Sequence, residues 1–152
     1  MADINVAEAN DFKQYIAVMI DGEQYGIDIN YIDNIVRMQR ITRVPKAQEY
    51  FAGVINLRGE VVPVMSLRLK FGLEADSYGP KSRILIIKPE AQASIGFIVD
   101  EVLEVVTIAD KNIDHVSDVE EKSYVIGVGK HLKGLVSILN INAVLAEKEA
   151  NS

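Results

Sequence analysis

Apolar and polar residues alternate along much of this chain with the period of two that is typical of β-strands. Turn residues such as Asp21-Gly22 separate the alternating stretches. Helical signals are confined to short segments. Together these patterns predict a mainly β fold, built as small barrels or as a sandwich. The predicted strands are 12–20, 24–29, 54–55, 61–64, 83–88, 94–99, 102–108, 124–128 and 132–139, and the predicted helices are 46–51, 66–71 and 140–146.

The apolar pattern occurs twice. The apolar positions that follow Gly26 recur with the same spacing after Gly96. The stretch 61–67 matches 135–141, apolar residue for apolar residue, and a capping residue then opens a short helix in both. We therefore expect two similar β units that shield faces which neither could bury alone. A further match pairs Gly53-Val54 with Gly127-Val128.

The domain boundaries follow from the polar stretches. Residues 1–11 and 147–152 are polar and are expected to be flexible. Between them, 12–146 is expected to form a single domain of two lobes, approximately 12–76 and 82–146, with segments free to exchange between the lobes. At 152 residues with 49% hydrophobic side chains, the chain can bury one shared core.

The segment around Asn56-Leu57-Arg58-Gly59-Glu60 is the most informative part of the chain. Two β-branched runs flank it, which predicts a hairpin whose tip needs the positive φ that Gly59 can adopt. Arg58 then lies at the turn, where its guanidinium can leave the sheet and meet a carboxylate. The segment holds no catalytic group, so we expect it to be bound by a partner. The alternative is an arginine paired with a neighbour inside its own lobe.

The sequence GVINLRGEVVPVMSLRLKFG at 53–72, preceded by YGIDINYIDNIVRMQRITRVP at 25–45, resembles the CheW coupling proteins of bacterial chemotaxis. The resemblance runs from about Asp11 to Leu145. It implies two five-stranded SH3-like β-barrel subdomains around a shared hydrophobic core. It also implies a non-catalytic adaptor that couples the cytoplasmic tips of chemoreceptors (methyl-accepting chemotaxis proteins) to the regulatory domain of the histidine kinase CheA.

The resemblance also implies sites. Arg58 matches the family arginine that is implicated in receptor contact, and the region from Ile32 to Val36 lies beside the receptor-facing groove. Gly53 and Val54 fall near the kinase-facing side. The repeated apolar positions supply further groove candidates. The receptor-binding set is therefore Arg58, Ile29, Ile32, Asn34, Val36, Val99 and Val102, with Val105 as a further apolar candidate, and the kinase-binding set is Gly53 and Val54.

One position departs from the family pattern. Where the family often carries a glutamate that pairs with the motif arginine, this chain has Asn34. A neutral amide cannot make that salt bridge. Arg58 is therefore expected to be freer, or to pair with Glu60 or with a receptor carboxylate. An exposed ion pair contributes only about 0–1 kcal/mol, so its loss should alter presentation more than stability.

Charge and composition narrow the function. The net charge of −6 argues against general nucleic-acid binding. Basic residues gather in 37–70 and acidic residues in 90–121, which could give two sides that attract different partners. The chain has no cysteine, no apolar run long enough for a membrane span and no evident signal peptide. We expect a cytoplasmic protein without direct membrane insertion, recruited to membrane-associated receptor arrays.

Catalytic chemistry is poorly represented. His115 and His131 lack ligand-spaced partners and are expected to be surface residues. The carboxylates of Asp100, Glu101 and Glu104 are expected to form a solvated strand edge, and 127–130 a hairpin turn rather than a phosphate loop. We therefore predict no catalytic residues, metal or cofactor. Two other functions stay open: a small-ligand-binding β-barrel domain, and a detached regulatory domain of a larger chemotaxis protein.

Overall fold

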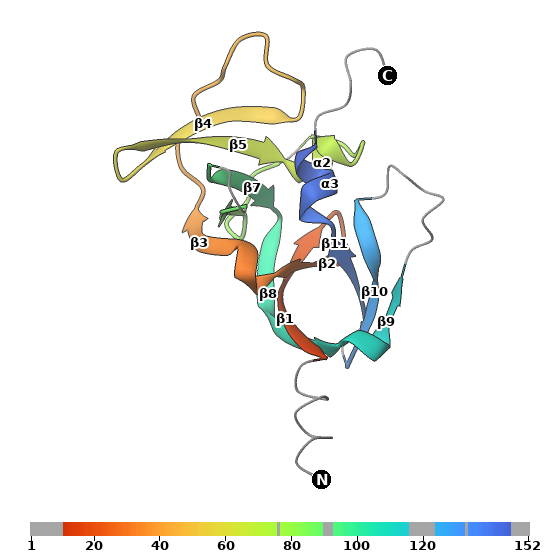
Figure 1. Cartoon of the computed structure of the whole chain (residues 1–152). Coiled ribbons are helices and arrows are strands. Elements are labelled where there is room, and N and C mark those ends of the chain that lie inside the picture. The colour runs from red at the N-terminus through yellow and green to blue at the C-terminus, as the bar shows by residue number, and fades with distance from the viewer. Residues whose placement is uncertain (1–10, 76, 90–92, 116–123, 133, 147–152) are drawn as a thin grey trace.

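The computed structural model describes residues 11–75, 77–89, 93–115, 124–132 and 134–146. It contains eleven named strands with short helices between them (Figure 1). The mainly β prediction is confirmed. The first half of the chain holds β1 (Phe12–Ile20), β2 (Glu23–Asp28), η1 (Ile29–Tyr31), β3 (Ile32–Arg37), β4 (Phe51–Leu57), β5 (Glu60–Ser66) and α2 (Leu67–Lys70). The second half holds β6 (Arg83–Ile87), β7 (Ile95–Val99), β8 (Glu101–Ala109), η2 (Asp110–Asn112), β9 (Ile113–His115), β10 (Val125–His131), β11 (Gly134–Leu139) and α3 (Ile141–Leu145).

The strands form two sheets. Sheet A has six strands in the order β8-β1-β2-β11-β10-β9, and sheet B has five in the order β3-β6-β7-β5-β4. Sheet A curls strongly and brings β10 close to β8, which is not its neighbour in the sheet. A Cβ added to Gly129 of β10 would lie only 2.9 Å from the Ile108 side chain of β8. The sheets therefore hold six and five strands rather than five each. Among the described strands, the first and last strand of each sheet are not hydrogen-bonded to each other, so neither sheet is a closed barrel.

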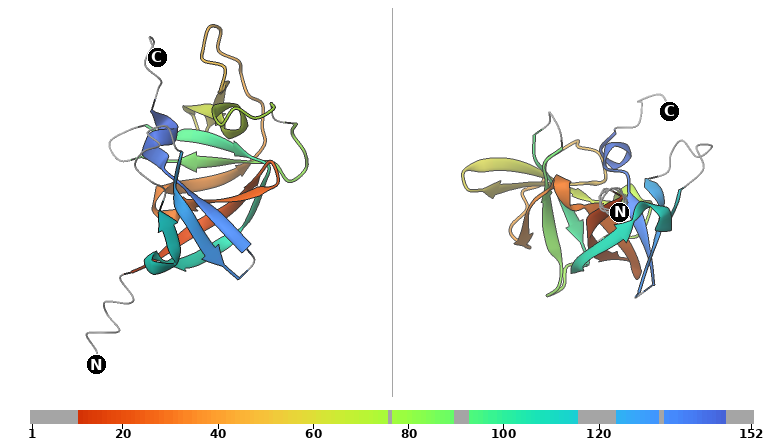
Figure 2. Two further views of the ribbon diagram at one scale, coloured as in Figure 1. Left: turned by 90° about the vertical axis from the view of Figure 1, so that its right-hand side faces the viewer. Right: turned by 60° about the horizontal axis from the view of Figure 1, so that its bottom comes forward.

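Neither half of the sequence supplies a whole sheet. The β1–β2 hairpin of the first half pairs in parallel with β11 of the second half, and β7 of the second half pairs in parallel with β5 of the first. Two crossings exchange the remaining strands: β2 in sheet A leads through η1 to β3 in sheet B, and β7 in sheet B leads to β8 in sheet A. The two halves of the repeat thus have the same arrangement of strands, but each gives its first hairpin to the sheet of the other: β1–β2 lies in sheet A and β6–β7 in sheet B (Figures 1 and 2).

Three apolar clusters fill the molecule. The largest lies where the sheets meet, with the fully buried Phe97 of β7 packed among residues of both sheets. One smaller cluster lies within each sheet. On β6, Ile84 and Ile86 face the inner cluster of sheet B while Leu85 and Ile87 face the shared cluster. Burial on both faces explains why this strand is an unbroken apolar run.

Several local predictions are wrong in instructive ways. The expected helix at 46–51 is a turn leading into β4, because Lys46 has a φ of +64°. The expected turn at 127–130 lies inside β10, and the chain reverses between His131 and Gly134. Gly127 is needed there because a Cβ would lie 2.6 Å from the Asp114 carbonyl oxygen of β9. The strands β3 and β9 were not predicted.

The two short helices, α2 and α3, lie side by side (Figure 1). Ser66 caps α2 by accepting a hydrogen bond from the Leu69 amide, and Asn140 caps α3 in the same way from Ala143. Lys70, at the end of α2, is only 7% exposed. Its Nζ lies 4.0 Å from the Tyr50 ring centroid and donates a hydrogen bond to the Ala146 carbonyl oxygen at 3.0 Å. This lysine therefore ties α2 to the end of α3.

Replacing Lys70 with methionine should lower the free energy of unfolding by about 1–3 kcal/mol. The substitution keeps most of the apolar stem but removes the cation–π contact and leaves the Ala146 carbonyl without this donor. Urea unfolding followed by circular dichroism measures the change. Lys81→Met is the control, because the Lys81 side chain is 73% exposed and should shift stability by less than about 0.5 kcal/mol. Equal effects of the two substitutions would contradict the proposed role of Lys70.

Candidate functional site

Arg58 lies at the tip of the β4–β5 hairpin. Leu57 pairs with Glu60, so Arg58 and Gly59 form a two-residue turn, and their φ values of +52° and +82° are those of a type I′ turn. The Gly59 amide donates a hydrogen bond to the Asn56 side chain at 3.1 Å, which stiffens the tip. The hairpin reaches out from the rest of the molecule in Figure 1 and in the right-hand view of Figure 2.

The guanidinium of Arg58 is exposed, and no ion pair forms between it and any carboxylate of the described residues. The pairing with Glu60 that the sequence left open is therefore not present. Asn34 cannot supply the missing charge either, because its amide is neutral; its side-chain oxygen accepts a hydrogen bond from the Ile35 amide at 2.8 Å. A cation held on a short, hydrogen-bonded turn is available to a carboxylate from outside the chain.

The apolar candidates differ in exposure. Val99 is fully buried in the shared core, so it does not line a surface in this structure. Ile29, Ile32 and Val102 are half-buried against the same core, and they lie at the two crossings between the sheets. Val36 is half-buried against the inner cluster of sheet B. The crossings therefore present apolar side chains that are only partly covered.

Two exposed aliphatic residues add to this surface. Ile35 of β3 is 38% exposed and Val105 of β8 is 50% exposed. They occupy equivalent positions in the internal repeat, and both strands lie at an open end of their sheet. Ile35 was not selected from the sequence, although the repeat that links it to Val105 was visible there. The bulge between Ile32 and Asn34 lets Ile32 pack against the shared cluster and Val36 against the inner cluster of sheet B, whereas Ile35 stays exposed.

The residues predicted to face the kinase lie on β4. Gly53 is buried, with a φ of +146°, and the main chain of Thr42 packs directly against it. Val54 is half-buried, and both its amide and its carbonyl are bonded to Thr42 at 2.8 Å. Since Thr42 covers the strand edge at this point, Val54 can offer a partner its side chain but not an open backbone edge.

The acidic cluster at the start of β8 is solvated only in part, because Glu104 is exposed whereas Asp100 is partly buried. Asp100 accepts hydrogen bonds from Arg68 and from the Asp21 amide. The Arg68 hydrogen bond is the main cause of a lowered pKa for Asp100, against which partial burial acts, and the Asp21 amide lowers it further. The carboxylate therefore stays ionised at neutral pH. His115 lies 3.8 Å from Asp110, and both its side chain and that of Asp110 are exposed, so this contact is a surface feature.

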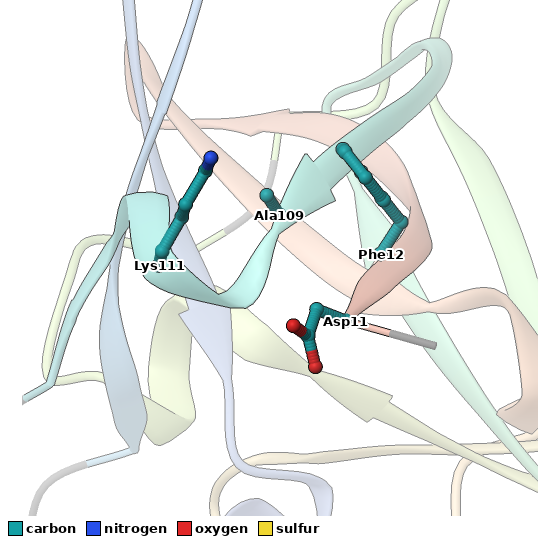
Figure 3. Close-up of a pocket in the computed structure, with 4 residues that line it drawn as sticks. All are labelled: Asp11, Phe12, Ala109 and Lys111. Atoms are coloured by element: carbon teal, nitrogen blue, oxygen red, sulfur yellow. The ribbon is translucent and has the colours of Figure 1, made fainter. Parts of the chain in front are cut away.

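Two hollows lie on the surface of the described residues. One, with a volume of about 150 Å³, is lined by Asp11, Phe12, Ala109 and Lys111. Figure 3 shows the Phe12 ring and the Lys111 chain on either side of Ala109 at the end of sheet A. Sites for small molecules usually enclose about 300–1,000 Å³, which this hollow does not reach. The other hollow, with a volume of about 340 Å³, is lined by Met19, Gln24, Glu101, Leu103 and Glu104. It reaches that size, but its lining is mainly polar, whereas sites for small molecules are mainly apolar.

Two further properties of the described residues bear on function. No cluster of histidine, cysteine or carboxylate side chains among them could hold a metal ion. None of their helices is both long and apolar enough to cross a bilayer. The conspicuous features of this part of the chain are thus surfaces: a projecting cation and partly covered apolar crossings. Fold and surface together define a small two-sheet β module equipped for protein binding.

Comparisons with known proteins give the family. The family model described as the CheW-like domain matches residues 14–149. The chemotaxis protein CheW of Helicobacter pylori is 38% identical over 87% of this chain and 81% of its own length. That of Bacillus subtilis is 32% identical over 96% and 95%. The crystal structure of the scaffolding protein TtCheW from Thermoanaerobacter tengcongensis superposes with a TM-score of 0.77 at 32% identity, covering 84% of this chain and 88% of that one. The chain belongs to the CheW family of chemotaxis adaptors.

Proposed function

We propose that this protein is a non-catalytic adaptor that couples the cytoplasmic tips of chemoreceptors to the regulatory domain of the histidine kinase CheA. It would act in the cytoplasm, at receptor arrays. The presentation of Arg58 carries the proposal, because an exposed arginine held on a rigid tip is suited to a carboxylate on a partner. We also propose that each curled sheet corresponds to one SH3-like barrel of the family.

The receptor-binding surface would combine one polar and several apolar contacts. Arg58 would fix the register of a receptor helix against one of its carboxylates. The half-buried residues at the crossings would accept the apolar side chains of that helix, as amphipathic helices bind apolar grooves. The proposed contact set is Arg58, Ile29, Ile32, Val36 and Val102, extended by the exposed Ile35 and Val105.

The kinase-binding surface would lie on β4 of sheet B. Val54 would supply a side-chain contact there, while Gly53 shapes the strand. Because the receptor and the kinase would bind different residues, one molecule could hold both at once. Such tethering raises the effective concentration of the kinase at the receptor without any chemistry by the adaptor itself.

Mixing the protein with a receptor-tip fragment and the kinase regulatory domain should produce a single complex that contains all three. Size-exclusion chromatography with light scattering measures its mass, and a mixture without the adaptor is the control. Two outcomes would contradict the proposal: failure to bind either component, or binding of the two components only in competition with each other.

A further inference from the structure

We propose that Arg68 and Asp100 are positioning residues that set the start of β8, and with it Val102, for receptor binding. This inference rests on the proposed function and adds two residues outside the proposed contact set. The two side chains are 19% and 29% exposed, so their ion pair is shielded from solvent more than most surface pairs.

The ion pair joins three segments that are far apart in the sequence. The Arg68 guanidinium comes from α2 and binds Asp100 through two hydrogen bonds, Nε to Oδ1 at 3.1 Å and Nη2 to Oδ2 at 2.7 Å. The Asp21 amide, in the β1–β2 turn, donates to the same carboxylate at 2.8 Å. The Asp21 carboxylate lies 3.6 Å from Arg68 Nη1. We call this group the crossing clamp, since Asp100 is the residue between β7 of sheet B and β8 of sheet A.

The start of β8 depends on this clamp more than the rest of the strand does. Val102 pairs with Val18 and Glu104 with Ala17, so Leu103 forms a bulge between them. The bulge separates Glu101 and Val102 from the long regular ladder that follows. The amide of Asp100 adds one bond to the Met19 carbonyl at 3.0 Å. The clamp therefore fixes a short piece of strand that the sheet holds only weakly.

The other crossing between the sheets is made without such an ion pair. The alignment of the two halves places Asn30 opposite Asp100 and Asn142 opposite Arg68. Two asparagines cannot form an ion pair, yet the chain crosses between the sheets there as well, through η1. The charged clamp occurs at the crossing that carries Val102 and is missing at the other. The clamp is therefore specific to the β7–β8 crossing, where Val102 lies, while η1 makes the turn at the β2–β3 crossing, where Ile29 and Ile32 lie.

The test compares Asp100→Asn with the unaltered protein for binding to the receptor-tip fragment. The substitution keeps the size of the side chain and removes its charge. Receptor affinity should fall by about fivefold to thirtyfold, which is typical of residues that act through the position of others. Affinity for the kinase domain should stay within about twofold. In the isolated protein, the amide protons of Glu101 and Val102 should exchange faster. Arg68→Lys, which keeps the charge but loses the two-pronged geometry, should show a smaller change in the same direction.

A matched control separates positioning from general loss of stability. Ile108→Val shortens a buried side chain further along β8, away from the clamp, and should lower the melting temperature while leaving receptor affinity unchanged. The inference is overturned if Asp100→Asn binds the receptor tip as well as the unaltered protein, or if Ile108→Val weakens binding equally. If the unaltered protein does not bind the receptor tip at all, the proposed function has failed. The exchange rates of Glu101 and Val102 would then still report on the clamp.

Discussion

Arg58→Glu should weaken binding of the receptor tip by about thirtyfold to a thousandfold. Removing a hydrogen-bonded charge from an interface costs about 2–4 kcal/mol, and the new carboxylate adds repulsion. Isothermal titration calorimetry measures the affinity. The fold should be unaffected, because Arg58 is exposed and makes no ion pair with the described carboxylates. Kinase binding should also be unchanged.

Arg43→Glu is the matched control for this prediction. Arg43 is an exposed arginine in the same basic stretch. Its replacement by glutamate changes the net charge of the protein by the same amount as Arg58→Glu. If general electrostatic attraction held the receptor, both substitutions would weaken binding to a similar degree. Equal losses, or no loss with Arg58→Glu, would remove Arg58 from the site.

Arg58→Asn gives a second signature of function. Arginine at a φ of +52° is strained by about 1 kcal/mol, whereas asparagine adopts this conformation readily. Asparagine should therefore raise the free energy of unfolding slightly while weakening receptor binding. An arginine that is unfavourable for its own turn is easiest to understand as a residue kept for a partner.

The sequence allowed the hairpin site to be predicted because its signals are local. Gly59 and the flanking β-branched runs define the turn within a few residues, and the position of Arg58 follows from it. The short helices were equally local, since Ser66 and Asn140 are capping residues in the sequence and in the structure. Such features depend on neighbours along the chain, which a sequence displays directly.

Features that depend on distant contacts were harder to predict. β3 was missed because its residue types do not follow its burial: Asn34 is polar but half-buried, and Ile35 is apolar but exposed. Val99 was assigned to a groove because the repeat shows that a position is apolar but not which side of the strand is covered. Asp100 was taken as solvated because its partner, Arg68, lies on α2, far away in the sequence. Which residues meet across the two sheets is decided by the exchange of hairpins, which no local pattern records.

Gly53 shows how a residue that the fold requires for a distant contact can be mistaken for a binding residue. A Cβ at this position would clash with the Thr42 carbonyl oxygen, and the φ of +146° is one that side chains rarely adopt. The close approach lets Thr42 pair with Val54 and cover the edge of β4. The glycine is thus required by the fold, and any effect of replacing it on kinase binding would act through β4.

Gly53→Ala should lower the free energy of unfolding by about 2–4 kcal/mol, because the backbone of Thr42 must move and the strained φ remains. For a chain of this length, that corresponds to a fall of about 4–16 °C in melting temperature. Scanning calorimetry measures it. Gly59→Ala is the control: its φ is also positive at +82°, but nothing lies within 4 Å of the added carbon, so the loss should be only about 1 kcal/mol. If the two variants melt together, the contact with Thr42 is not what makes glycine necessary at 53. If instead Gly53→Ala is the less stable and Val54→Ala alone weakens kinase binding in a folded protein, the two neighbours have separate roles: Gly53 shapes the strand and Val54 contacts the partner.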